Sequence, residues 1–213
     1  EFSGAKRVDA SLSDADLYAT NLQRADFTNA DLSWSDLSRS NLKKAKFMNT
    51  DFHKAYLFGS DMREVNFELA DLSGVWMGNS DLSNSILRGA DLSNSDFAGS
   101  DLRFADLSSA DLWRADFSNT CLIQADLRGA YLSRAWFSNA DLRGADLFGA
   151  DLSHVDLSNK VIRGKRSDLV GADLSGADLR EVKFFKTDLW RADLTGSKVD
   201  GANFEGAYWN ETI

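Results

Sequence analysis

Large apolar residues recur at every fifth position along almost the whole chain. From Leu12 to Leu157 each of these central positions holds Leu, Phe or Met, and the rule resumes from Leu169 to Trp209, with Val199 and Trp209 as its only departures. Two residues before each central residue stands Ala, Ser, Thr or Val, in all 39 units. This regularity predicts one continuous repeat architecture.

A five-residue period fits neither a helix nor a straight strand. Five residues advance a helix by about 500°, which scatters apolar residues around it, and they alternate the faces of a strand. Within a unit, however, the small and central residues are two apart, which is strand spacing and directs both to one side. The chain must then turn through the next three residues to direct the following pair inward. A parallel solenoid does this, because each unit is too small to bury its apolar side chain without neighbours.

The spacing of the central phenylalanines predicts the number of sides in each coil. Five pairs of them are four units apart, whereas only Phe52 and Phe67 are three units apart. Aromatic rings on adjacent coils stabilise one another beyond the effect of burial. We therefore expect four-sided coils, with one unit on each side and nearly ten coils in all. The pairs are Phe27–Phe47, Phe47–Phe67, Phe97–Phe117, Phe117–Phe137 and Phe184–Phe204.

The unit resembles the repeat of the pentapeptide-repeat family, whose consensus is A-D/N-L-x-x. Residues 90–94 read Ala-Asp-Leu-Ser-Asn and residues 140–144 read Ala-Asp-Leu-Arg-Gly, and the resemblance covers about residues 10–209. It implies an all-β fold, a right-handed quadrilateral parallel β-helix with four faces. The handedness is an implication of the resemblance and not of the period.

Interruptions of the period divide the chain. The spacing from Leu157 to Leu169 exceeds that of two whole units by two positions, which we interpret as a two-residue phase slip with a loop at 158–168. Residues 10–157 and 169–209 then form one β-helix, residues 1–9 cap its first coil, and residues 210–213 are a tail. We expect Trp209 to cover the terminal edge as a lid or to mediate an end-to-end homodimer through the C-terminal coil; otherwise the protein is a monomer.

The break at 158–168 also holds the main basic cluster of the sequence. The functional interpretation is a projecting loop that contacts a partner, since loops often carry function. The alternative is a tolerated insertion with solvated charges. The basic residues are Lys160, Arg163, Lys165 and Arg166.

Net charge limits the classes of partner. The chain carries −9, and residues 61–120 alone hold 4 basic and 11 acidic residues, a net charge of −7. Direct binding of nucleic acid calls for a basic face, so it is not expected. The longest apolar run, at 55–58, is four residues, far short of the about 20 that a membrane span needs. The single cysteine, Cys121, fits a reducing compartment, and we expect a cytoplasmic protein, although a removed targeting segment stays possible.

Aspartate precedes the central residue in 24 of the 39 units. Turn chemistry explains most of these aspartates, because Asp and Asn bond to nearby backbone groups. A second interpretation is that they form acidic ladders on two faces. One candidate ladder holds Asp61, Asp81 and Asp101, and the other holds Asp71, Asp91 and Asp111. A calcium site would need several oxygens around one ion, which one Asp per coil does not supply, so no metal and no cofactor is expected.

Aromatic residues replace the aspartate at two positions of one face. Tyr56 and Trp76 are four units apart, and we expect Phe58 beside them on the same face, so that the three form an exposed aromatic patch next to the acidic segment. Exposed aromatic residues are enriched at the centres of protein interfaces. These three residues are therefore the candidate interface; the alternative is that the rings only stack on each other.

The sequence favours a non-enzymatic function. His53 and His154 lie five coils apart, no histidine neighbours Cys121 in register, and no phosphate-binding or nucleophile motif is present. We expect a rigid scaffold that binds another protein, of unknown identity, through an outer face.

The alternative function follows from the resemblance. Some members of the family mimic B-DNA, bind DNA gyrase or topoisomerase IV and protect them from quinolones or similar toxins. B-DNA carries one charge per about 1.7 Å of axis, whereas this rod carries about one net charge per 5 Å. The chain also has no room after Trp209 for the C-terminal helix through which those members dimerise, and it lacks their Cys-rich repeats.

Overall fold

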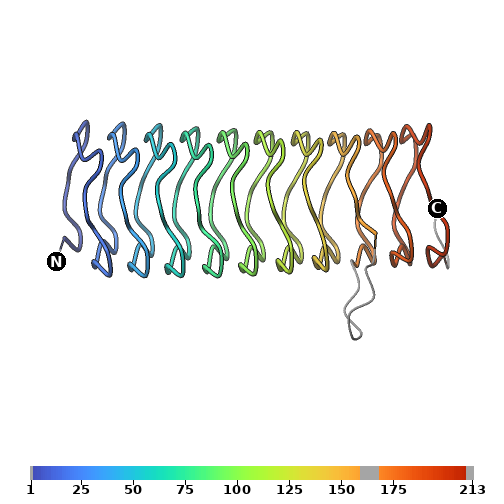
Figure 1. Ribbon diagram of the computed structural model, residues 1–213, viewed down its shortest axis with the longest axis horizontal. Helices are drawn as coiled ribbons and strands as arrows, with labels where there is room; N and C mark the ends of the chain where they lie inside the picture. The colour runs from blue at the N-terminus through green and yellow to red at the C-terminus, as the bar shows by residue number, and fades with distance from the viewer. Residues whose placement is uncertain (1, 159–167, 210–213) are drawn as a thin grey trace.

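Each five-residue unit forms one side of a coil, and four units complete the coil. The computed structural model describes residues 2–158 and 168–209. Single-residue parallel bridges join each outward residue to its equivalent on the next coil, as from Asp61 to Asp81 and from Asp81 to Asp101. Within the described residues there is no helix and no strand longer than one bridge residue. Figure 1 shows the coils stacked along one axis, with the first and last coils at opposite ends.

Backbone hydrogen bonds between coils explain why such short bridges suffice. The amide of central Leu82 donates to the carbonyl of Asp101 on the next coil at 2.7 Å, and the amide of Asp81 donates back to the carbonyl of Ser60 at 3.1 Å. A residue in the left-handed region ends each side, with φ of 59° at Asn84 and 64° at Gly89. Asn and Gly adopt this conformation at low cost, which explains their frequency at the last position of the unit.

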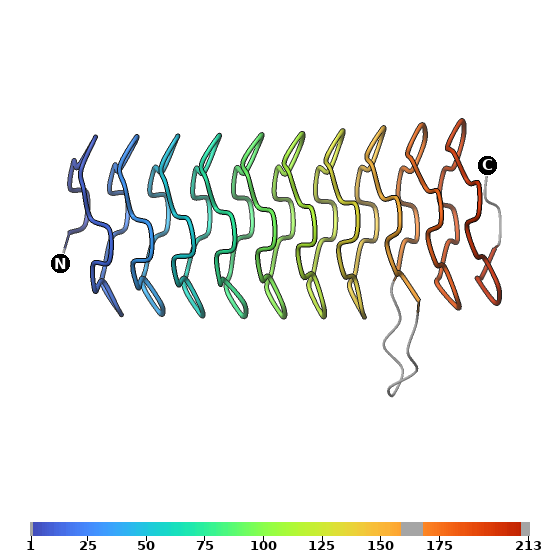
Figure 2. The ribbon, with the colours of Figure 1, turned by 45° about the horizontal axis from the view of Figure 1, so that its top comes forward.

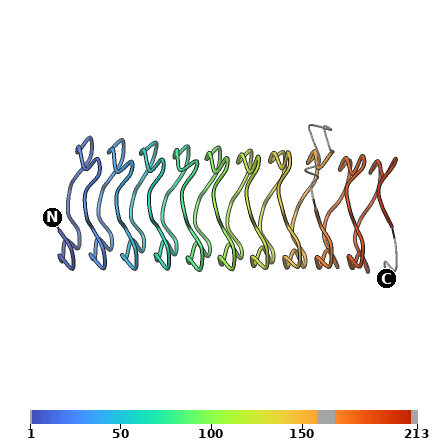
Figure 3. The same cartoon turned by 90° about the horizontal axis from the view of Figure 1, so that it is seen from below.

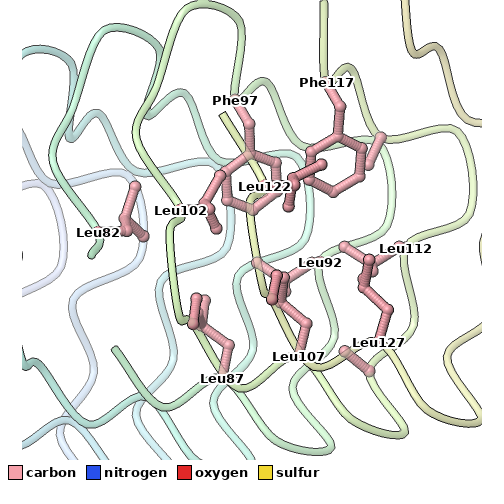
Figure 4. Close-up of a cluster of buried hydrophobic side chains, with 14 of the residues drawn as sticks. Leu82, Leu87, Leu92, Phe97, Leu102, Leu107, Leu112, Phe117, Leu122 and Leu127 are labelled. Carbon is pink, nitrogen blue, oxygen red and sulfur yellow. The ribbon is translucent and has the colours of Figure 1, made fainter. Parts of the chain in front are cut away.

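The core is a dry column of central side chains. All described central residues from Leu22 to Leu189 are buried. Figure 4 shows part of this column, between Leu82 and Leu127, with the side chains directed inward from different sides of the coil. The five phenylalanine pairs predicted from sequence all stack, with ring centroids 4.7 to 5.6 Å apart and planes within 16°. The prediction of a four-sided coil, with one unit on each side, is therefore confirmed.

We number the sides of the coil in the order in which the chain forms them. Side 1 carries the outward residues Asp71, Asp91 and Asp111; side 2 carries Tyr56, Trp76 and Trp136; side 3 carries Asp61, Asp81 and Asp101; and side 4 carries Asp106, Asp126 and Asp146. Sides 1 and 3 are consequently opposite each other, and side 2 lies between them.

The break in the period differs from its prediction. Asp141 bridges to Asp168, 27 positions away instead of the usual 20, so this coil is seven residues longer than the others. Seven residues still displace the five-residue period by two positions, but the insertion is longer than the two residues that the spacing from Leu157 to Leu169 suggests. The unit of Leu157 lies on side 2 and the unit of Leu169 lies on side 3. Figures 2 and 3 show that the coils before and after this point stay aligned. The basic residues predicted to act here, Lys160, Arg163, Lys165 and Arg166, lie outside the described residues.

Both ends of the described chain continue the coil. Arg7, in a central position but exposed, donates its amide to the carbonyl of Asp26 at 2.7 Å, so the segment predicted to cap the rod already has coil geometry. At the other end Trp209 packs on Phe204, with centroids 4.9 Å apart. The capping and dimerisation roles stay predictions. No helix long and apolar enough to span a membrane occurs in the part of the chain that is described.

Candidate functional site

The predicted aromatic interface is partly assembled on side 2. Tyr56 and Trp76 form a parallel bridge, and their rings meet edge to face at 5.3 Å and 72°. Their exposed fractions are 39% and 58%. Phe58, 46% exposed, lies in the turn that ends the same unit and makes no ring contact with either among the described residues. The rings therefore stack on each other and still present a large apolar surface to solvent.

The two acidic ladders differ in charge. On side 3, the Arg63 guanidinium donates to Asp61 at 2.7 Å and lies 3.6 Å from Asp81, and Arg103 donates to Asp101 at 2.9 Å. The hydrogen bond from Arg63 lowers the pKa of Asp61 below its usual range. This ladder is therefore largely neutralised by its own arginines.

The charge of the ladder on side 1 is not neutralised by arginines of the described residues. Asp71, Asp91 and Asp111 are bridged in succession and all exposed, and none makes an ion pair within residues 2–158 and 168–209. The ladder extends through Asp31 and Asp51 on the two preceding coils. In these five units the position after the central residue holds Ser, His or Trp. On side 3 the same position holds Arg in the units of Asp61 and Asp101, which explains why, of the two ladders, the one on side 3 has the ion-paired aspartates. Only one of the two predicted ladders is thus a bare acidic surface.

Turn chemistry accounts for the aspartates themselves, as expected. In all 24 units with an outward Asp, its Oδ1 accepts the backbone N–H two residues further on, at 2.8 to 3.3 Å. Asn21, Asn41, Asn66 and Asn203 make the same bond. One carboxylate oxygen is therefore committed to the fold, and only the other is available to a partner.

The remaining candidates for chemistry are separate from one another. His53 Nδ1 lies 2.7 Å from the Ser73 hydroxyl. Five coils further along the rod, His154 Nδ1 lies 3.0 Å from a Glu181 oxygen. Burial raises the pKa of the Cys121 thiol, which disfavours the reactive thiolate. No group of three or more metal-ligating side chains occurs among the described residues.

Sequence reasoning missed a basic groove at the edge between sides 1 and 2. Its volume is about 360 Å³, and its lining includes Arg114, Arg134, His154 and Lys183 beside Trp136. The available signal was the four-unit spacing of Arg114, Arg134 and His154 at one position of the unit. Lys183 could not be included from sequence, because its alignment with Trp136 depends on the true length of the insertion.

Comparison with protein families agrees with the repeat. Eight stretches match the sequence pattern of the family described as Pentapeptide repeats, at residues 1–33, 25–64, 35–74, 66–103, 77–114, 85–124, 125–159 and 165–201. Among curated proteins no match to the chain was found.

Solved structures extend the likeness to the whole rod. HetL, a pentapeptide repeat protein involved in heterocyst differentiation regulation from the cyanobacterium Nostoc sp. strain PCC 7120, is 30% identical, with a TM-score of 0.91 over 95% of this chain and 87% of HetL. Full-length QnrB1, a plasmid-mediated fluoroquinolone resistance protein, is 18% identical, with a TM-score of 0.66 over 97% of this chain and 94% of QnrB1. The likeness to QnrB1 concerns the fold alone. With these matches the right-handed quadrilateral β-helix is confirmed, and the chain belongs to the pentapeptide repeat family.

Proposed function

We propose that the protein is a rigid, non-enzymatic scaffold that binds another protein through side 2. The observation that carries the proposal is the exposed pair of Tyr56 and Trp76, in positions that the fold itself would fill with Asp. An aspartate there makes a turn hydrogen bond that the aromatic side chains forgo. Two successive exceptions to a structural rule, both exposed and both aromatic, favour binding over folding as their cause.

The surroundings of the pair define the partner. Asp36 and Asp96 flank it on side 2, and the bare ladder on the adjacent side 1 passes Asp51, Asp71 and Asp91. An apolar centre beside uncompensated carboxylates is complementary to a protein surface with an apolar patch and a rim of Lys or Arg. The involvement of HetL in regulation agrees with a role exerted by contact with another protein, without identifying it.

Removal of the aromatic surface tests the proposal. Substitution of Tyr56, Phe58 and Trp76 by Ser should reduce capture of the partner by about tenfold or more in quantitative pull-downs from a native lysate, because interface aromatic residues carry much of the binding energy. The matched control substitutes Phe104, Phe148 and Trp190, which are similarly exposed on sides 3 and 4, by Ser. Capture that survives in the first variant, or that is lost equally in the control, contradicts the proposal.

A second candidate function rests on the bare ladder of side 1. Five successive coils present Asp31, Asp51, Asp71, Asp91 and Asp111 along one line, at the about 4.8 Å spacing of bridged chains. A DNA strand presents one phosphate per about 3.4 Å, so the ladder approaches the charge density of one strand. This favours a DNA mimic that acts on a type II topoisomerase.

A supercoiling assay distinguishes the two functions. A DNA mimic should change supercoiling by gyrase, with and without a quinolone, and the effect should be lost when Asp71, Asp91 and Asp111 are replaced by Asn, which keeps the turn hydrogen bond. The same replacement of Asp61, Asp81 and Asp101 should have little effect, because arginines already neutralise much of that ladder. No effect of the unaltered protein on gyrase excludes this candidate and leaves the scaffold untouched.

A further inference from the structure

The basic groove between sides 1 and 2 is built by four successive coils. Arg114, Arg134 and His154 end the side 1 units of the first three coils, and Trp136, Asp156 and Lys183 are outward residues of side 2 on the last three. At about 360 Å³, the groove falls within the size range of small-molecule sites. It therefore has room for more than a single bound ion.

The arginines and the lysine of this groove make no ion pair with any described residue, in contrast to the arginines that directly follow a central residue. Arg63, Arg103, Arg128, Arg143 and Arg180 directly follow a central residue, and each pairs with the Asp of its own unit. Arg114 and Arg134 stand one position later, where φ is 59° and 63°. The unit of Arg134 carries Tyr131 in its outward position, so it has no aspartate with which this arginine could pair. Neither they nor Lys183 make an ion pair within the described residues.

The balance of charge in the groove indicates its ligand. His154 is 3.0 Å from Glu181, which does not itself line the groove. Arg114, Arg134 and Lys183 against Asp156 leave two positive charges, in a chain whose net charge is −9. A single carboxylate would neutralise one of them, whereas a phosphate monoester carries about −1.5 to −2 at neutral pH and accepts from several donors. Arginine forks match phosphate geometry particularly well.

Trp136 adds an apolar surface to the charged one. Its side chain is 50% exposed, and it replaces the Asp found on the coils before and after it. Arg114 lies 4.7 Å from the centroid of the Trp113 ring, which restrains the guanidinium at the end of the groove while its edge stays available. The groove thus combines an aromatic wall with fixed cations.

We propose that this groove binds a small phosphate monoester that carries an aromatic ring, with the phosphate on Arg114, Arg134 and Lys183 and the ring against Trp136. A nucleoside monophosphate has this chemistry. The proposal needs no protein partner on side 2, so it stands independently of the scaffold function.

Calorimetric titration of the full chain with adenosine monophosphate, adenosine and inorganic phosphate tests the proposal. We expect adenosine monophosphate to bind more tightly than phosphate, and adenosine to bind not at all, because the charge supplies most of the attraction. Replacing Arg114 and Arg134 by Asn should weaken binding of both phosphates by about tenfold or more. Replacing Trp136 by Ser should weaken binding of adenosine monophosphate only.

The matched control replaces Arg24 and Arg39 by Asn. These residues hold the same position of the unit, with φ of 58° and 59°, so the control has the same net charge and the same backbone conformation. Asn accepts this conformation, and unchanged thermal unfolding of each variant verifies its fold. The proposal is overturned if neither phosphate binds the unaltered protein, if adenosine binds as well as its monophosphate, or if the control loses binding equally. Binding of a phosphotyrosine peptide without binding of the free monophosphate would likewise contradict it.

Discussion

At the scale of the residue, hydroxyl side chains in the small position do more than leave room for the core. The hydroxyl of buried Ser80 donates to the carbonyl of Leu57 at 2.9 Å and accepts the amide of Ser60 at 3.1 Å. Ser40, Ser60 and Ser100 repeat this pattern of donation to the preceding coil. By contrast, Ser85 Oγ is buried and has no hydrogen-bond partner among the described residues. Serine in the small position therefore stabilises side 3, where its hydroxyl is hydrogen-bonded, and is unfavourable at Ser85 on side 4, where it is not.

Two alanine substitutions, one unit apart, test this difference. Ser80→Ala should lower the free energy of unfolding by about 1–3 kcal/mol, because it leaves a buried amide and a buried carbonyl without partners. Ser85→Ala should be neutral or stabilising, since it removes a hydroxyl that burial has desolvated without compensation. Urea unfolding of both variants measures the two effects. An equal decrease in the free energy of unfolding of both variants would show that the hydrogen bonds of the hydroxyl do not determine stability at this position.

At the scale of the element, the outward column of side 3 shows how an arginine decides the state of its aspartate. Asp61 and Asp168 stand in this column with the same exposure of their side chains, 29%. The hydrogen bond from Arg63 lowers the pKa of Asp61, whereas burial raises the pKa of Asp168. Arg143 pairs with Asp141 at 2.6 Å and approaches Asp168 only to 3.6 Å. Asp168, whose own unit has no arginine, is thus less compensated than Asp61.

The opposite shifts predict opposite responses to substitution and pH. Asp61→Asn should destabilise the protein at neutral pH, and this cost should disappear as pH falls through the lowered pKa of Asp61, where the native carboxylate is also protonated. Asp168→Asn should be neutral or stabilising at neutral pH. Because the pKa of Asp168 is raised in the folded protein, this carboxyl stabilises the fold only at low pH, where it is protonated, and its contribution is lost as pH rises through the raised pKa. Both variants keep the turn hydrogen bond. Thermal unfolding at neutral pH and in acid measures the responses, and destabilisation of equal size in both at neutral pH would contradict the assignment.

At the scale of the whole molecule, the sequence predicted the fold well because the period repeats one local rule. The stacked rings of Phe97, Phe117 and Phe137 follow directly from it. The size of the insertion did not follow, since Ile162 is an apolar residue five positions after Leu157, so the sequence does not decide whether a unit stands there. The net charge of each acidic ladder could not be predicted either, because it depends on which arginine side chains pair with which aspartates. The basic groove joins side chains from four coils and two sides, which no local pattern contains.

The strict stacking of the coils has a consequence for how such a molecule can change over generations. Loss or gain of four whole units shifts everything downstream along the axis by one coil and keeps every surface in its own direction. Loss of a single unit instead turns the whole remainder by a quarter of a revolution, so that a binding surface on side 2 would come to face where side 1 or side 3 did. The seven additional residues of one coil do not carry this penalty, because the bridges from Asp141 to Asp168 and onward still join equivalent sides. Whole coils can therefore be lost or gained, while the direction of each surface is inherited unchanged.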